Sequence, residues 1–160
     1  MRSFASVFIL LFCIGSSSFA VDDSEPVTLL GTIVKWQYPK SKINGATMSD
    51  AATMDASEKR TVPSTMLKTT MTTEDSVEDV LNFYQELLKR DPKTDDKLGD
   101  KAEAGRSVIF SDESDGRPFA FHTISVNTST ASTTLIITRG ADETETRITW
   151  KRYLQLKTGG

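Results

Sequence analysis

The chain has 160 residues, with 22 acidic and 19 basic side chains, one histidine and one cysteine. This length suits one ordinary domain, and the mild acidity lacks the basic patch that nucleic-acid binding requires. No segment after residue 20 approaches the roughly twenty apolar residues that a membrane-spanning helix needs.

The first twenty residues have the pattern of a secretory signal peptide. Arg2 provides the positive end, residues 7–14 form a short apolar run, and residues 18–20 place small side chains at a cleavage site after Ala20. We therefore expect an exported chain that begins at residue 21. It loses Cys13 with the leader and keeps 18 basic and 22 acidic residues, a net charge of −4.

An exported chain without cysteine has no disulfide and must be held together by its core. This favours a bacterial protein that is periplasmic or extracellular. The expected organisation is a signal peptide over residues 1–20, a polar tail over 21–26, a single domain over 27–157 and a C-terminal tail over 158–160.

The first half of the domain predicts two strands. Residues 27–36 are rich in β-forming side chains and end before Tyr38-Pro39, because proline cannot donate to a sheet ladder. Residues 40–60 are polar and predict a mobile loop, whereas residues 64–72 alternate as a second strand.

The clearest predicted element is an amphipathic helix over residues 75–89. Asp75 is the expected N-cap with Glu78 three residues on, and Asp91-Pro92 ends the helix. Its apolar stripe contains Val77, Val80, Leu81, Tyr84, Leu87 and Leu88. Residues 93–106 are charged and predict a solvated loop.

The rest of the chain predicts an antiparallel meander of strands over residues 107–112, 118–126, 132–139 and 145–156. The last strand alternates apolar and polar residues, as a sheet with one wet face requires, and Arg152 interrupts its apolar series. We therefore expect an α+β domain in which one long amphipathic helix packs on an antiparallel sheet of five or six strands, in the order β-β-α-β-β-β-β.

Few residues suggest chemistry. His122 is the candidate catalytic residue, as a general base, although a partly buried, hydrogen-bonded strand histidine is the simpler explanation. One histidine without cysteine gives no zinc site, no EF-hand spacing occurs, and no G-x-S-x-G or glycine-rich phosphate loop is present. We expect no metal and no cofactor.

Trp36 and Tyr38 are the candidate ligand-binding residues, because aromatic side chains beside a polar loop can hold a sugar or a peptide. The alternative is that the pair closes the edge of the core.

A resemblance is carried by Tyr38-Pro39 and by the run from Thr73 to Tyr84, which reads T-x-D-S-x-E-x-V-L-x-F-Y. In these features the chain resembles a loose group of small exported bacterial domains of unknown function. It departs from the group after Pro39, where Lys40-Ser41 replaces Gly-Ala. The resemblance implies a helix-on-sheet fold and no particular activity.

Three functions remain open. The leading hypothesis is a non-enzymatic binding or interaction module of the bacterial cell envelope, whose partner is a protein, a peptide or a glycan, without nucleic acid and without a membrane span. The alternatives are a small hydrolase that depends on carboxylates or on His122, and a cystatin-like inhibitor, which rests on fold analogy alone.

Overall fold

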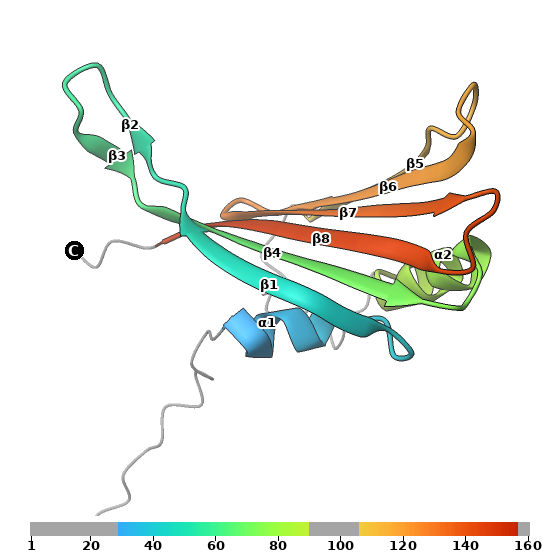
Figure 1. Ribbon diagram of the computed structural model, residues 1–160. Helices are drawn as coiled ribbons and strands as arrows, with labels where there is room; N and C mark the ends of the chain where they lie inside the picture. Colours follow the sequence, from blue (N-terminus) through green and yellow to red (C-terminus); the bar gives the residue numbers. More distant parts are fainter. Residues whose placement is uncertain (1–28, 90–105, 157–160) are drawn as a thin grey trace, which may run out of the picture.

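The computed structural model describes residues 29–89 and 106–156. Its main feature is a six-stranded antiparallel sheet in the order β1-β4-β8-β7-β6-β5, with two short helices below it and a small β2-β3 hairpin standing out at one end (Figure 1). The elements are α1 (Leu29–Trp36), β1 (Lys42–Asp50), β2 (Thr53–Met54), β3 (Arg60–Val62), β4 (Ser64–Thr73), α2 (Val77–Leu87), β5 (Ser107–Asp112), β6 (Phe119–Asn127), β7 (Ala131–Gly140) and β8 (Thr146–Gln155).

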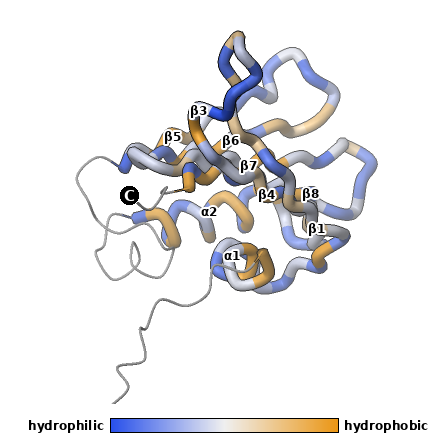
Figure 2. Tube along the Cα trace, turned by 90° about the vertical axis from the view of Figure 1, so that its left-hand side faces the viewer, coloured by the Kyte–Doolittle hydropathy of each residue, from blue (hydrophilic) through white to orange (hydrophobic). Residues whose placement is uncertain are grey.

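Both helices lie on the same face of the sheet, and the other face has no described element over it (Figure 2). Side chains alternate along each strand, so that every second residue faces the helices. These residues and the inner sides of the helices form one apolar core, which includes Ile33, Trp36, Met71, Val80, Tyr84, Ile124, Leu135, Ile137, Ile148 and Trp150. The rings of Trp36 and Trp150 are 6.3 Å apart at the centre of this core.

The prediction of a strand over residues 27–36 is wrong, because residues 29–36 form helix α1. Leu29, Ile33 and Trp36 recur at helical spacing and face the core, while Leu30 and Val34 are exposed. Valine, isoleucine and threonine favour strands only weakly, and the packing of one apolar helical face against the sheet outweighs that preference.

The prediction of a loop over residues 40–60 is also wrong, because residues 42–50 form the edge strand β1. Ile43 and Ala46 are the half-buried apolar residues of this strand that pack against the core, so it lacks the apolar alternation that would reveal it. Its place is set by main-chain pairing with β4, and a bulge between Ile43 and Gly45 interrupts the register.

The predicted helix over residues 75–89 is present in shorter form as α2, and its N-cap is Ser76 rather than Asp75. The Ser76 hydroxyl accepts a hydrogen bond from the Asp79 N–H at 3.1 Å, and the Asp79 carboxylate accepts one from the Ser76 N–H. Val80, Tyr84 and Leu88 of the predicted stripe are buried. The expected fold, with one long helix packed on the sheet, is therefore wrong, because the domain is mostly β and its helical residues are divided between two short helices.

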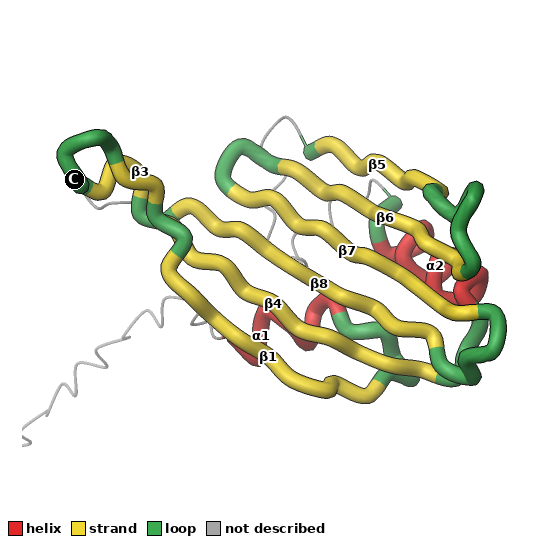
Figure 3. Tube along the Cα trace, turned by 45° about the horizontal axis from the view of Figure 1, so that its top comes forward, coloured by secondary structure: helices red, strands yellow, loops and turns green. Residues whose placement is uncertain are grey.

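The predicted strand over residues 64–72 is confirmed as β4, and the four C-terminal strands are confirmed as β5 to β8, each within one or two residues of the expected bounds. β4 pairs with β8, which joins the first half of the chain to its last strand (Figure 3). Arg152 on β8 is buried in the core side of the sheet, with its guanidinium 5.9 Å from the Trp36 ring.

Several predictions lie outside the described residues. These are the signal peptide with Cys13 and its cleavage after Ala20, the polar tail at 21–26, the helix end at Asp91-Pro92, the loop over 93–106 except for residue 106, and the C-terminal tail at 158–160. Among the described helices, neither is long and apolar enough to cross a membrane.

Candidate functional site

The most distinctive surface is the side of the six-stranded sheet that faces away from α1 and α2, which we name the open face (Figure 3). Threonine and serine are the commonest strand side chains on this face, which also carries Met66, Ile109, Phe119, Phe121 and Ile136. Across the six strands, all of which the structure describes, the open face has four basic side chains and no acidic one; the basic residues are Lys42, Lys68, Arg147 and Lys151. The net charge of the whole chain is −3, so positive charge is concentrated here.

Lys68 and Lys151 form a pair at the middle of the open face. They are directly opposite each other in the register of β4 and β8, and both are exposed. Like charges at opposed positions of an antiparallel ladder are destabilising. Neither ammonium has a hydrogen-bond or ion-pair partner among the described residues, whereas Arg147 pairs with Glu143 at 2.9 Å. The lysine pair is therefore a concentration of positive charge without a described counter-ion.

Hydroxyl groups lie beside the lysine pair in its own row and on one flank, whereas Met66 and Tyr153 lie on the other flank. One row across the sheet runs Thr47, Lys68, Lys151, Thr134 and Ser125, and the neighbouring row contains Thr70 and Thr149. Within the described part of the chain, these five hydroxyls bond to no other side chain or main-chain group. The centre of the open face thus presents hydroxyls and ammonium groups that have no internal partner.

Some hydroxyls nearer the margin of the open face are bonded internally. Thr72 accepts from the Asn44 amide at 3.1 Å, and Ser132 donates to Asn127 at 2.7 Å. The hydroxyls at the centre are therefore among those of the open face that remain able to bond to a ligand.

A shallow hollow of about 350 Å³ borders the lysine pair where β1 is bulged. Asn44, Gly45, Thr47, Lys68 and Thr70 contribute to its lining. A side chain built at Gly45 would meet nothing within 4 Å, so the absence of a side chain there leaves open space beside the Lys68 stem. A ligand that contacts Lys68 therefore has room to extend toward the sheet edge.

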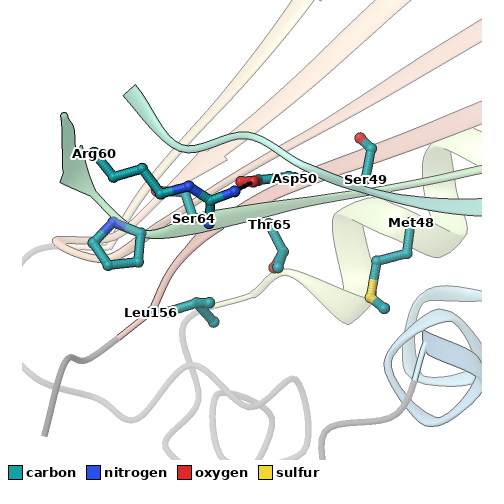
Figure 4. A pocket seen from close by; sticks show the side chains of 8 residues that line it. Met48, Ser49, Asp50, Arg60, Ser64, Thr65 and Leu156 are labelled. Atoms are coloured by element: carbon teal, nitrogen blue, oxygen red, sulfur yellow. Dashed lines mark hydrogen bonds and ion pairs between the residues drawn. The ribbon is translucent and has the colours of Figure 1, made fainter. Parts of the chain in front are cut away.

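A second hollow, of about 240 Å³, lies at the base of the β2-β3 hairpin (Figure 4). Met48, Pro63 and Leu156 give it apolar walls, and Asp50 forms an ion pair with Arg60 across it. The two charged groups satisfy each other, which leaves this hollow without a free charge to select a ligand.

The candidate catalytic residue His122 is on β6, on the side of the sheet that carries the core, and therefore not on the open face. Its side chain is 17% exposed, and its Nδ1 is 3.5 Å from the Asp112 carboxylate on the edge strand β5. Hydrogen bonds from Ser114 hold the pKa of Asp112 below its usual value. His122 stands opposite Ile137 and near Ile124, and no described serine or cysteine lies within hydrogen-bond distance of its ring.

The candidate ligand-binding residues Trp36 and Tyr38 are both buried in the core, so neither ring forms an open platform for a ligand. The Tyr38 hydroxyl donates to the Asp75 carboxylate at 2.5 Å, and the Lys40 ammonium is 3.1 Å from the same group. Burial, with the adjacent Asp75, raises the pKa of Tyr38 to about 12, and the Tyr38 hydrogen bond lowers that of Asp75. These contacts join the end of α1 to the start of α2.

No group of three or more histidine, cysteine, aspartate or glutamate side chains that could hold a metal ion occurs among the described residues.

The lysine pair was missed by sequence reasoning. The alternation of β4 and β8 places each lysine on the polar side of its own strand, but only the pairing register, between segments 83 positions apart, brings the two together.

The residues of the sequence resemblance have identifiable structural roles. Tyr38 bonds to Asp75, Ser76 caps α2, and Val80 and Tyr84 fill the core. In these roles the residues of the pattern hold the two helices against the sheet, and the family resemblance itself stays a prediction.

Comparisons with protein-family models, curated proteins and solved structures found no match to this chain.

Proposed function

We propose that this protein is an exported binding module that holds its ligand on the open face of the sheet. The observation that carries the proposal is the Lys68–Lys151 pair, which is exposed, opposed and without a described counter-ion. Two opposed like charges do not stabilise the fold. An external negative group that pairs with both ammonium groups would therefore explain why the two lysines stand opposite each other.

The arrangement of the rest of the molecule supports the same proposal. Both helices pack on the other face, where they cover the apolar core. The described acidic residues lie away from the centre of the open face: in the hairpin, in α2 and just before it, at the outer ends of β1 and β5, and in the turns before β6 and β8. The open face is therefore accessible and keeps its positive charge. Such a surface attracts a negative partner and orients it before contact.

Differential lysine labelling tests this use of the open face. The purified protein is acetylated with a lysine-reactive ester, alone and in the presence of the cell-envelope fraction of its source organism, and the modification of each lysine is followed by mass spectrometry. We expect Lys68 and Lys151 to be protected severalfold by the fraction. Lys59 in the hairpin and Lys89 after α2 serve as internal controls, because both are exposed and away from the open face. Equal labelling of all four lysines with and without the fraction would contradict the proposal.

Export is the second part of the proposal, and it rests on the signal-peptide pattern of the first twenty residues. N-terminal sequencing of the protein recovered from outside the cytoplasm should begin at Val21. Recovery of a processed chain that retains Cys13 would contradict cleavage after Ala20.

A further inference from the structure

We infer that the ligand of the open face is an acidic polysaccharide, whose negative groups bind at the Lys68–Lys151 pair; this inference rests on the proposed binding function. The register of β4 and β8 places the two lysines opposite each other. The Cβ atoms of such a pair are separated by about 5 Å, so two flexible ammonium groups can converge on one carboxylate or sulfate. Charge-assisted hydrogen bonds to such a group are stronger than neutral ones.

The surroundings of the lysine pair favour a sugar polymer over a small anion. Five hydroxyls extend from the pair toward both sheet edges and have no internal hydrogen-bond partner among the described residues. They belong to Thr47, Thr70, Thr134, Thr149 and Ser125. A hydroxyl both donates and accepts hydrogen bonds, as sugar hydroxyls do. A chain of sugars that crosses the strands would meet hydroxyls on both sides of the central charge.

The same geometry disfavours an acidic peptide that binds through its main chain. A peptide that extends a sheet adds a strand at an edge, where main-chain groups are free. Lys68 and Lys151 are on β4 and β8, which are inner strands with neighbours on both sides, so their main-chain groups are used within the sheet. The centre of the open face can therefore recognise a ligand through side chains alone.

The charges around the pair are compatible with an anionic ligand. Arg147 is the nearest charged residue to Lys151 along the open side of β8, and it is basic. Its ion-pair partner Glu143 is in the turn before β8. Glu113 approaches the opposite margin, where it accepts a weak hydrogen bond from Thr123 at 3.3 Å. Both carboxylates are at the ends of the strands. Neither is therefore close enough to the lysine pair to repel an acidic ligand bound there.

Binding to defined polymers tests the inference. Isothermal titration at low salt is carried out with alginate oligosaccharides, dextran sulfate, neutral dextran and poly-L-glutamate. We expect binding to alginate or dextran sulfate that weakens as salt screens the charges, and no binding to dextran. Comparison of the first two probes shows whether a carboxylate or a sulfate is preferred. Poly-L-glutamate bound as tightly as the acidic glycans would overturn the assignment to a polysaccharide.

Matched variants locate the site. The double variant Lys68→Gln/Lys151→Gln should weaken binding of the acidic glycan by about tenfold, the loss expected when two exposed ion pairs are removed. The control Lys59→Gln/Lys89→Gln removes the same charge from the hairpin and from the end of α2, and should change binding by less than about twofold. The lysine-pair variant should unfold at or above the wild-type temperature, because it relieves a like-charge contact.

The outcomes separate this inference from the proposed function. Equal weakening in both double variants, or no binding of either acidic glycan, would overturn the acidic polysaccharide as ligand. If Lys68 and Lys151 are nevertheless protected by the envelope fraction, the open face is still the binding surface and its ligand belongs to another class. If protection is absent as well, both proposals fail.

Discussion

Ile33→Ala is the substitution that tests most sharply how α1 contributes to the core. Ile33 is 0% exposed and belongs to the core cluster with Trp36. The change removes three carbon groups, each worth about 0.8 kcal/mol on transfer from water. The cavity left behind adds a further cost, so we expect a loss of about 3–4 kcal/mol, within the range measured for buried isoleucine and leucine.

Val34→Ala is the matched control, because Val34 is the next residue of α1 and is 60% exposed. It should change the free energy of unfolding by less than about 0.5 kcal/mol. Urea unfolding followed by tryptophan fluorescence suits the measurement, since Trp36 and Trp150 are both buried and are the only tryptophans of the chain. With a slope of about 2 kcal/mol per molar urea, the Ile33→Ala midpoint should fall by about 1.5–2 M. A midpoint equal to wild type, or an equal fall for Val34→Ala, would refute the packing of α1 on the sheet.

The remaining predictions concern α2 and the contacts at its start. Tyr84→Phe removes a buried hydroxyl that donates to the Trp36 carbonyl at 2.8 Å, and the unpaired carbonyl should reduce the free energy of unfolding by about 1–2 kcal/mol in the same assay. Ser76→Ala removes the N-cap acceptor of the Asp79 N–H and should cost about 1 kcal/mol, while a change near zero would refute the cap. The pKa of Asp75 is lowered in the folded chain by its phenol and ammonium neighbours; its contribution is therefore complete above the unfolded value near 3.9 and is lost as the pH falls through the folded value. Asp75→Asn should flatten the fall of the urea midpoint below about pH 4, and an unchanged pH profile would show that this carboxylate does not contribute.

Much of the C-terminal sheet could be predicted because its strands carry their own signal. In β7 and β8, buried residues such as Leu135, Ile137, Ile148 and Trp150 alternate with less buried ones, and a turn separates the two strands. Sequential antiparallel strands with short connections pair with their neighbours, so periodicity and turn residues were sufficient there.

The first half of the chain was predicted less well because its local signals are weak or ambiguous. The eight residues of α1 are too few to separate helical from strand periodicity, and its valine, isoleucine and threonine residues favour strands. β1 shows little apolar alternation, because Ile43 and Ala46 are its half-buried core contacts. Tertiary contacts with the rest of the sheet decide the structure of both segments, and these contacts cannot be recognised in the local sequence pattern.

The candidate site was beyond sequence reasoning for a related reason. Trp36 and Tyr38 are aromatic residues beside a polar segment, which is typical of a binding site, yet both are buried in the core. Lys68 and Lys151 each look like an ordinary solvated residue of an alternating strand. Their significance comes from the β4–β8 register, which is a property of the folded sheet.

Binding of an acidic glycan to the open face can be observed residue by residue by mapping NMR chemical shifts of the protein during addition of alginate oligosaccharides. We expect the largest changes at the amides of β4 and β8 around Lys68 and Lys151, with smaller changes at Thr47 and Thr134 in the same row. Changes confined to the hairpin base around Arg60, with the centre of the open face unaffected, would contradict this expectation.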